Sequence, residues 1–234
     1  STDAGVRSLM CPWERFSRAS LNTCEPDVCG WMVHPAESAS AFGYLFVAYF
    51  LWRRYGREDV LLPVRHFPAL IALAGFGSIV FHSSFAAPFQ ALDLSAISPL
   101  MGYLFAATLV HSRRGRARYF TLMVVCLAVS GAFLPFVALW LGFVGLAMQG
   151  VLVVGGFFRV AAGELRSNVQ WMSTLLVSGA ILLVLDHAQI GCVRGSLAHV
   201  IQPHVVWHVL SAASCFYLYK TERVLERRWS WPVS

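Results

Sequence analysis

Residues 67–85 read FPALIALAGFGSIVFHSSF, a stretch that contains no lysine, arginine, aspartate or glutamate. A helix that spans a bilayer needs about 20 mostly apolar residues, so this stretch is long enough to cross a membrane. It nevertheless carries Ser78 and His82, which are four residues apart and therefore share one face of a helix. Ionisable side chains within membrane segments are costly and usually functional. The stretch therefore predicts a membrane fold with a polar site inside it.

The composition of the whole chain supports this interpretation. Of the 234 residues, 57% are hydrophobic and 13% are charged, whereas soluble domains have about 45–50% apolar and about 25% charged residues. We predict an all-α polytopic membrane protein with one domain over residues 1–234. Seven transmembrane helices are expected, and Pro135 separates the fourth from the fifth. These spans cover residues 35–52, 67–85, 90–111, 119–134, 136–158, 169–185 and 203–219.

The basic residues predict the orientation of the chain. If the N terminus lies outside, 14 of the 18 lysines and arginines fall on the cytoplasmic side, as the positive-inside rule requires. Residues 1–34 then form an outer N-terminal segment, residues 35–220 the bundle, and residues 221–234 a cytoplasmic tail. The basic residues do not gather on one amphipathic face, so nucleic acid is not an expected partner. We expect a multi-pass protein of a bacterial inner membrane, or alternatively of the ER or Golgi membrane.

The cysteines agree with this topology. Four of them fall on the outer side, where an oxidising periplasm or lumen permits disulfides: Cys11, Cys24, Cys29 and Cys192. Four cysteines allow three pairings, and free thiols are the alternative. Cys126 and Cys215 lie within expected helices.

Ionisable side chains from three spans meet at one depth. His82 lies near the outer end of the second span, Asp93 at the start of the third, and His204 with His208 at the start of the seventh. The histidines of the HxxxH pair share one helical face, so both can bind one ion. Three imidazoles with an open fourth position are typical of catalytic zinc sites. Asp186 ends the sixth span on the same side, where it either supports the site or simply marks the helix end.

The motifs GSIVFHSSF, Asp93 and HVVWHVL in the last span resemble those of the CREST superfamily of seven-helix membrane proteins. The closest likeness is to alkaline ceramidases and their bacterial relatives. The resemblance implies that His82, His204 and His208 ligate zinc (Zn2+). It also implies that Asp93 orients and deprotonates the attacking water, and that Ser78 binds this water or the developing oxyanion.

The same resemblance implies two further features of the N-terminal segment. One is a pair of disulfides, Cys24 with Cys192 and Cys11 with Cys29. The other is a calcium (Ca2+) site, because alkaline ceramidases have an acidic N-terminal loop that a glutamate of the first helix closes. The spacing of the acidic residues here fits the family pattern only if a gap is introduced. His34 occupies one position available for the closing glutamate. The residues here that would provide ligands are Asn22, Glu25, Asp27 and Glu37.

The expected function is zinc-dependent hydrolysis of the amide bond in a ceramide-like membrane lipid, which yields a sphingoid base and a fatty acid. An ester-cleaving hydrolase of the type that remodels GPI anchors would use the same residues and stays an alternative. A receptor with a structural zinc site is a second alternative, although such members place the N terminus in the cytoplasm. A transporter is a third, but the chain lacks the internal repeats typical of transporters. No obligatory protein partner is implied.

Overall fold

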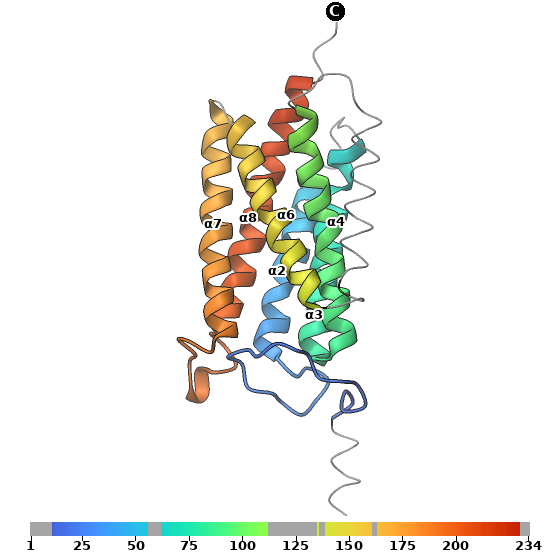
Figure 1. The fold of residues 1–234 in the computed structure, drawn as a ribbon, viewed down its shortest axis with the longest axis vertical. Helices are drawn as coiled ribbons and strands as arrows, with labels where there is room; N and C mark the ends of the chain where they lie inside the picture. The colour runs from blue at the N-terminus through green and yellow to red at the C-terminus, as the bar shows by residue number, and fades with distance from the viewer. Residues whose placement is uncertain (1–10, 56–61, 112–134, 136–138, 161–162, 230–234) are drawn as a thin grey trace, which may run out of the picture.

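The computed structural model describes residues 11–55, 62–111, 135, 139–160 and 163–229. Within these ranges the chain is all-α, as predicted, and its long helices run side by side in one bundle (Figure 1). Their bounds are α2 (Pro35–Tyr55), α3 (Leu62–Ser84), α4 (Ala87–His111), α6 (Leu139–Val160), α7 (Glu164–His187) and α8 (Pro203–Trp229). A short 3-10 helix, η1 (Gly195–Leu197), lies between α7 and α8.

Six of the seven expected spans correspond to these helices, and most of the helices extend a few residues beyond the expected bounds. The fourth expected span, residues 119–134, lies outside the described residues. By length and hydropathy, two helical segments qualify as membrane-spanning in the described ranges: His66–Ser84 in α3 and Leu165–His187 in α7. The shorter segment Val144–Phe158 in α6 is also apolar. Seven spans therefore stay a prediction.

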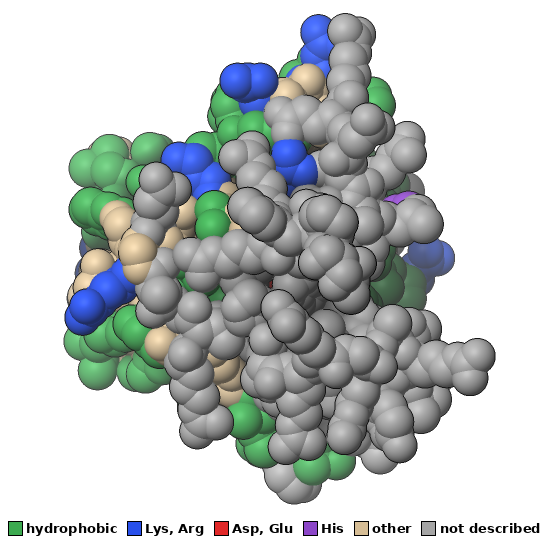
Figure 2. Space-filling model, turned by 90° about the horizontal axis from the view of Figure 1, so that it is seen from above, with side chains coloured by type: hydrophobic (Ala, Val, Ile, Leu, Met, Phe, Trp, Pro, Cys, Tyr) green, Lys and Arg blue, Asp and Glu red, His purple; other side chains and the backbone are tan. Residues whose placement is uncertain are grey.

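The outside of the bundle is rich in large apolar side chains. Phe46 is 70% exposed, Val151 73% and Val184 66%, so these residues cannot be contributing to a buried core. Seen from the end where α8 finishes, hydrophobic side chains occupy much of the rim and basic side chains lie on the end itself (Figure 2). Such a surface suits a lipid environment better than water.

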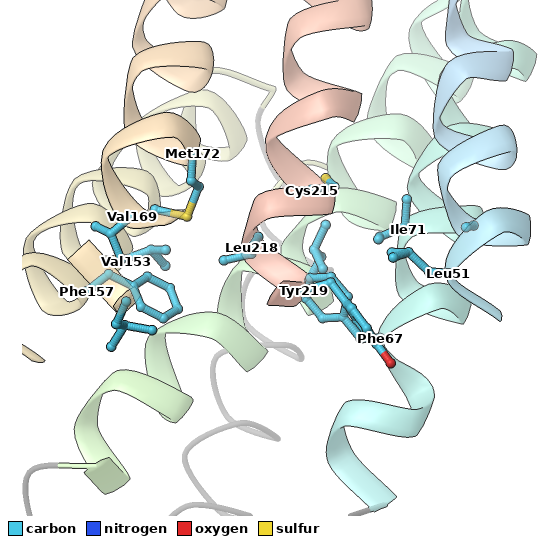
Figure 3. Close-up of a cluster of buried hydrophobic side chains, with 13 residues drawn as sticks. Leu51, Phe67, Ile71, Val153, Phe157, Val169, Met172, Cys215, Leu218 and Tyr219 are labelled. Atoms are coloured by element: carbon cyan, nitrogen blue, oxygen red, sulfur yellow. The ribbon is translucent and has the colours of Figure 1, made fainter. Parts of the chain in front are cut away.

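The main apolar core lies toward the end of the bundle where α2 finishes and α3 begins (Figure 3). Leu51, Phe67, Ile71, Phe157 and Leu165 are completely buried there. Tyr219 of α8 packs into the same cluster. This half of the bundle is held together by the burial of apolar surface and by close packing.

The opposite end carries the N-terminal segment and the loop between α7 and α8 (Figure 1). Two disulfides lie there, Cys11–Cys29 and Cys24–Cys192, which are the pairings that the resemblance implied. The second joins residues 168 positions apart in the sequence and so fixes the N-terminal segment to the loop that follows α7. Disulfides are typical of proteins in oxidising compartments. Cys215 is a buried free thiol in α8, and Cys126 lies outside the described residues.

A close approach of α3 and α4 brings their polar residues together. A Cβ added at Gly77 would lie 2.9 Å from the Ala96 Cβ and 3.3 Å from the Asp93 Cα. Only glycine therefore permits this spacing without a shift of one helix. Since Gly77 precedes Ser78, the contact places Asp93 next to the polar part of α3.

Candidate metal centre

Three buried imidazoles meet at the disulfide-bonded end of the bundle. His82 comes from the last turn of α3, and His204 and His208 come from the first two turns of α8. Their side chains offer one ligand nitrogen each within 4.8 Å of one another. They are 1%, 4% and 2% exposed, respectively, so the cluster is shielded from solvent. The three residues predicted as metal ligands are therefore brought together, and they could hold a metal ion.

His82 has a carboxylate behind it. Its Nδ1 lies 2.8 Å from Oε2 of Glu37, a completely buried side chain in the first turn of α2. A carboxylate at the outer nitrogen of a ligating histidine fixes the tautomer and the ring orientation. The approach has the distance of an ion pair but not the geometry of a hydrogen bond, and it leaves Nε2 of His82 as the nitrogen available to a metal.

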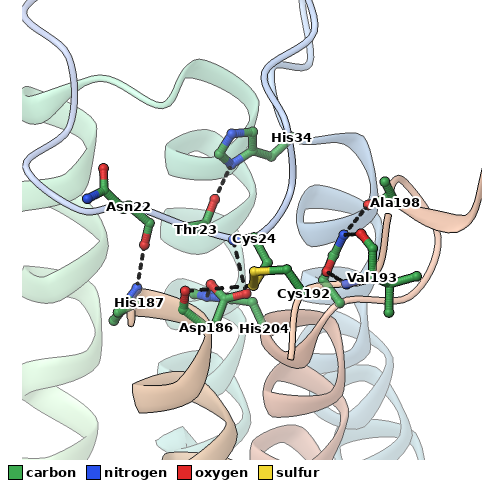
Figure 4. Close-up of a disulfide and its surroundings, with 11 residues drawn as sticks. Asn22, Thr23, Cys24, His34, Asp186, His187, Cys192, Val193, Ala198 and His204 are labelled. Atoms are coloured by element: carbon green, nitrogen blue, oxygen red, sulfur yellow. Dashed lines mark hydrogen bonds and ion pairs between the residues drawn. A yellow bond between two sulfur atoms is a disulfide. The ribbon is translucent and has the colours of Figure 1, made fainter. Parts of the chain in front are cut away.

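His204 has a corresponding partner in Asp186, which is also completely buried. Its Nδ1 lies 3.3 Å from Asp186 Oδ2, while Asp186 Oδ1 accepts a hydrogen bond from the Cys24 backbone N–H at 3.2 Å. Figure 4 shows this carboxylate between His204 and the Cys24–Cys192 disulfide. Of the two interpretations of Asp186, the structure therefore favours support of the site.

His208 is held by neutral oxygens. Its Nδ1 lies 2.8 Å from Ser40 Oγ and 3.2 Å from the Glu37 carbonyl oxygen. Because the Ser40 hydroxyl itself donates to the Glu37 carbonyl at 2.9 Å, the Nδ1–H of His208 is the donor to Ser40. All three imidazoles thus direct Nδ1 at an oxygen and keep Nε2 for a shared centre.

Ser78 and Asp93 lie beside this centre. Ser78 Oγ is 3.3 Å from His208 Nε2, one turn deeper in α3 than His82. Asp93 lies on α4 where that helix packs against Gly77, the residue before Ser78, and its buried Oδ1 has no hydrogen-bond partner in the described part of the chain. Buried acceptors are rarely left without a partner. An orphaned carboxylate oxygen at the same end of the bundle as three clustered imidazoles fits a metal site that also holds a water molecule.

The residues proposed for calcium lie nearby but are engaged elsewhere. Both oxygens of Glu25 accept hydrogen bonds from the first backbone N–H groups of α2, those of Ala36 and Glu37, at 2.9 Å. The Asn22 backbone carbonyl lies 3.0 Å from His187 Nδ1 (Figure 4). Asp27 and Glu37 both contact His34. Burial lowers the pKa of His34, but the hydrogen bond and the charge of Glu37, together with Asp27, outweigh burial and raise this pKa.

The sequence interpretation missed the roles of Glu37 and Ser40. Glu37 was considered only as a calcium ligand, although a carboxylate within an expected membrane span is itself a signal of function. Ser40 gives no comparable signal, since serine often bonds its own helix backbone. Comparison of the sequence with family models and with curated proteins gave no match.

Proposed function

We propose that this protein is a zinc-dependent hydrolase of the membrane, which cleaves the amide bond of a ceramide-like lipid into a sphingoid base and a fatty acid. One observation carries the proposal: three buried histidines converge beside an unpartnered carboxylate and a hydroxyl. A closed structural zinc site has four protein ligands, whereas a catalytic one has three and an open position.

The residues divide the chemistry among themselves. Zinc held by His82, His204 and His208 would supply Lewis acidity toward the carbonyl and a lowered pKa for water. Asp93 would accept the proton of the attacking water at its free Oδ1 and return it to the leaving amine. Ser78 would donate a hydrogen bond to the developing oxyanion, a contribution of about 3 kcal/mol in comparable sites.

The position of the site supports a lipid substrate. It lies at the disulfide-bonded end of an apolar bundle, which the predicted topology puts on the outer side, and the amide of a ceramide lies just below the headgroups. We propose that the protein has seven spans and lies in a bacterial inner membrane, or in the ER or Golgi membrane. The site would then lie near the periplasmic or lumenal face. Both an amide and an ester could react at these groups. The resemblance to alkaline ceramidases is what favours the amide.

Labelled ceramides and phospholipids incubated with the purified protein test the proposal. We expect fatty-acid release from ceramide, which a zinc chelator abolishes and added zinc restores. Release from phospholipid alone would instead indicate the ester-cleaving alternative. Bound zinc without turnover of either lipid would indicate a structural site, as in a receptor.

Two variants separate metal binding from chemistry. His204→Ala should lose zinc and turnover together, whereas Asp93→Asn should keep zinc and lose turnover. His66→Ala is the matched control, because His66 is exposed and lies near the other end of α3. Turnover that survives both changes would refute the mechanism.

A further inference from the structure

His34 is a buried histidine placed between two carboxylates. It is 1% exposed, and its Nδ1 lies 3.0 Å from Glu37 Oε2 while its Nε2 lies 2.9 Å from Asp27 Oδ1. Ionised carboxylates only accept hydrogen bonds, so a ring held against two of them donates from both nitrogens; the Thr23 hydroxyl, 3.4 Å from Nδ1, is a further and longer contact. The geometry therefore points to an imidazolium, a positive charge inside the N-terminal segment.

This charge belongs to a row of alternating charges that leads from the surface to the metal centre. At its outer end the Arg18 guanidinium pairs with Asp27 and donates to its Oδ1 at 2.9 Å. At its inner end the Glu37 oxygen that contacts His34 also lies 2.8 Å from His82 Nδ1. The backbone N–H of His34 donates to the carbonyl oxygen of His82 at 3.1 Å as well. His34 is thus tied to a predicted zinc ligand both directly and through Glu37.

The same carboxylates are those that the family resemblance assigns to calcium, and they do not fit that ion. Glu25 is satisfied by the N-terminus of α2 and lies 3.3 Å from His199 Nδ1, and Asp27 by Arg18 and His34. Glu37 Oε1 is the one oxygen of these three carboxylates without a hydrogen-bond partner among the described residues. Calcium takes about 6–8 oxygen ligands, and five of the six oxygens of these carboxylates are already paired with side chains or backbone N–H groups, so binding it would require most of these contacts to be broken.

A hollow of about 350 Å3 adjoins these groups. Asn22, Glu25 and Asp27 line it, and so does Arg18. The guanidinium adds a positive charge to the lining of this hollow. A side-chain cation therefore already pairs with Asp27 at this hollow.

We propose that the His34 side chain, placed between Asp27 and Glu37 and paired with both, takes the place of a bound divalent cation and holds Glu37 against the predicted metal ligand His82. The N-terminal segment would then organise the metal centre without calcium. This inference concerns how the site is assembled, and it holds whichever lipid bond the protein cleaves.

The decisive variant is His34→Glu, which replaces the internal cation with another carboxylate. The resulting acidic cluster should require calcium: we expect 1 mM calcium to raise its Tm by about 5–10 °C relative to calcium-depleted buffer. The wild type should show no such shift and no saturable calcium binding by isothermal titration calorimetry. His66→Glu adds the same charge at the far end of α3 and should stay insensitive to calcium.

A second variant covers the case in which His34→Glu does not fold. His34→Gln removes the positive charge without adding a negative one, so Glu37 should hold His82 less firmly. We expect its zinc affinity, measured by competition with a chromophoric chelator, to fall about tenfold. Saturable calcium binding by the wild type would overturn the proposal, as would a folded His34→Glu without a calcium response or an unchanged zinc affinity in His34→Gln. None of these measurements uses lipid turnover, and the calcium measurements do not depend on zinc either, so failure of the proposed function would not be mistaken for failure of this inference.

Discussion

The two ends of the bundle are stabilised by different physical interactions, although α3 and α8 run through both. At one end Phe67 and Ile71 of α3 pack with Tyr219 of α8 in an apolar core. At the other end His82 of α3 meets His204 and His208 of α8 among carboxylates and hydroxyls. Apolar contacts are numerous and non-directional, so the first end depends on volume. The arrangement of the second end depends on directional contacts between single atoms, so replacing one atom there can disturb it.

Removal of a predicted metal ligand at the polar end should give the largest effect on bound zinc and on lipid turnover. We expect His208→Ala to lose bound zinc and to reduce lipid turnover by at least about 10³-fold, since the metal and its chemistry are lost together. Zinc content by atomic emission and fatty-acid release measure the two effects. Retention of zinc at wild-type stoichiometry would contradict the assignment of His208.

A truncation at the apolar end should have the opposite signature. Phe157 is completely buried, and Phe157→Ala should lower the free energy of unfolding by about 3–5 kcal/mol because it leaves a cavity. Zinc content at a temperature where the variant is folded should stay at the wild-type level. Zinc loss from the folded variant would show that the two ends do not act separately.

Glu37→Gln tests whether the polar end responds to a change without loss of volume. The amide keeps the shape of the side chain but loses the negative charge behind His82 Nδ1. We expect zinc affinity to fall about 10–100-fold, with little change in turnover per bound zinc. Glu14→Gln at an exposed position is the matched control and should change neither quantity.

The sequence predicted that His82, His204 and His208 come together, because their spacing and depth are encoded locally. An i, i+4 pair fixes His204 and His208 on one helical face, and the expected spans place His82 and Asp93 at the same outer end. The resemblance also implied the Cys24–Cys192 and Cys11–Cys29 pairs that the structure contains. All-α architecture followed from composition and hydropathy.

The groups behind the ligands could not be predicted in the same way. Glu37 and Ser40 reach His82 and His208 only because α2 packs against both α3 and α8, and spacing along one helix contains no information on that packing. Asp186 had two interpretations because a carboxylate at a helix end is easily solvated. Its contacts with His204 and with the Cys24 backbone depend on a disulfide that closes 168 residues of chain.

Ser40→Ala should produce the smallest effect and thereby measure how much redundancy the polar end contains. The variant removes one of two oxygens at His208 Nδ1, but the Glu37 carbonyl remains 3.2 Å away and can accept the same hydrogen bond. A neutral hydrogen bond contributes about 0.5–1.5 kcal/mol, and a replacement partner lowers that cost. We therefore expect zinc affinity to fall by no more than about threefold, measured by the same chelator competition as for Glu37→Gln. A loss as large as that of Glu37→Gln would mean that the hydroxyl, and not the carbonyl, fixes the tautomer of His208.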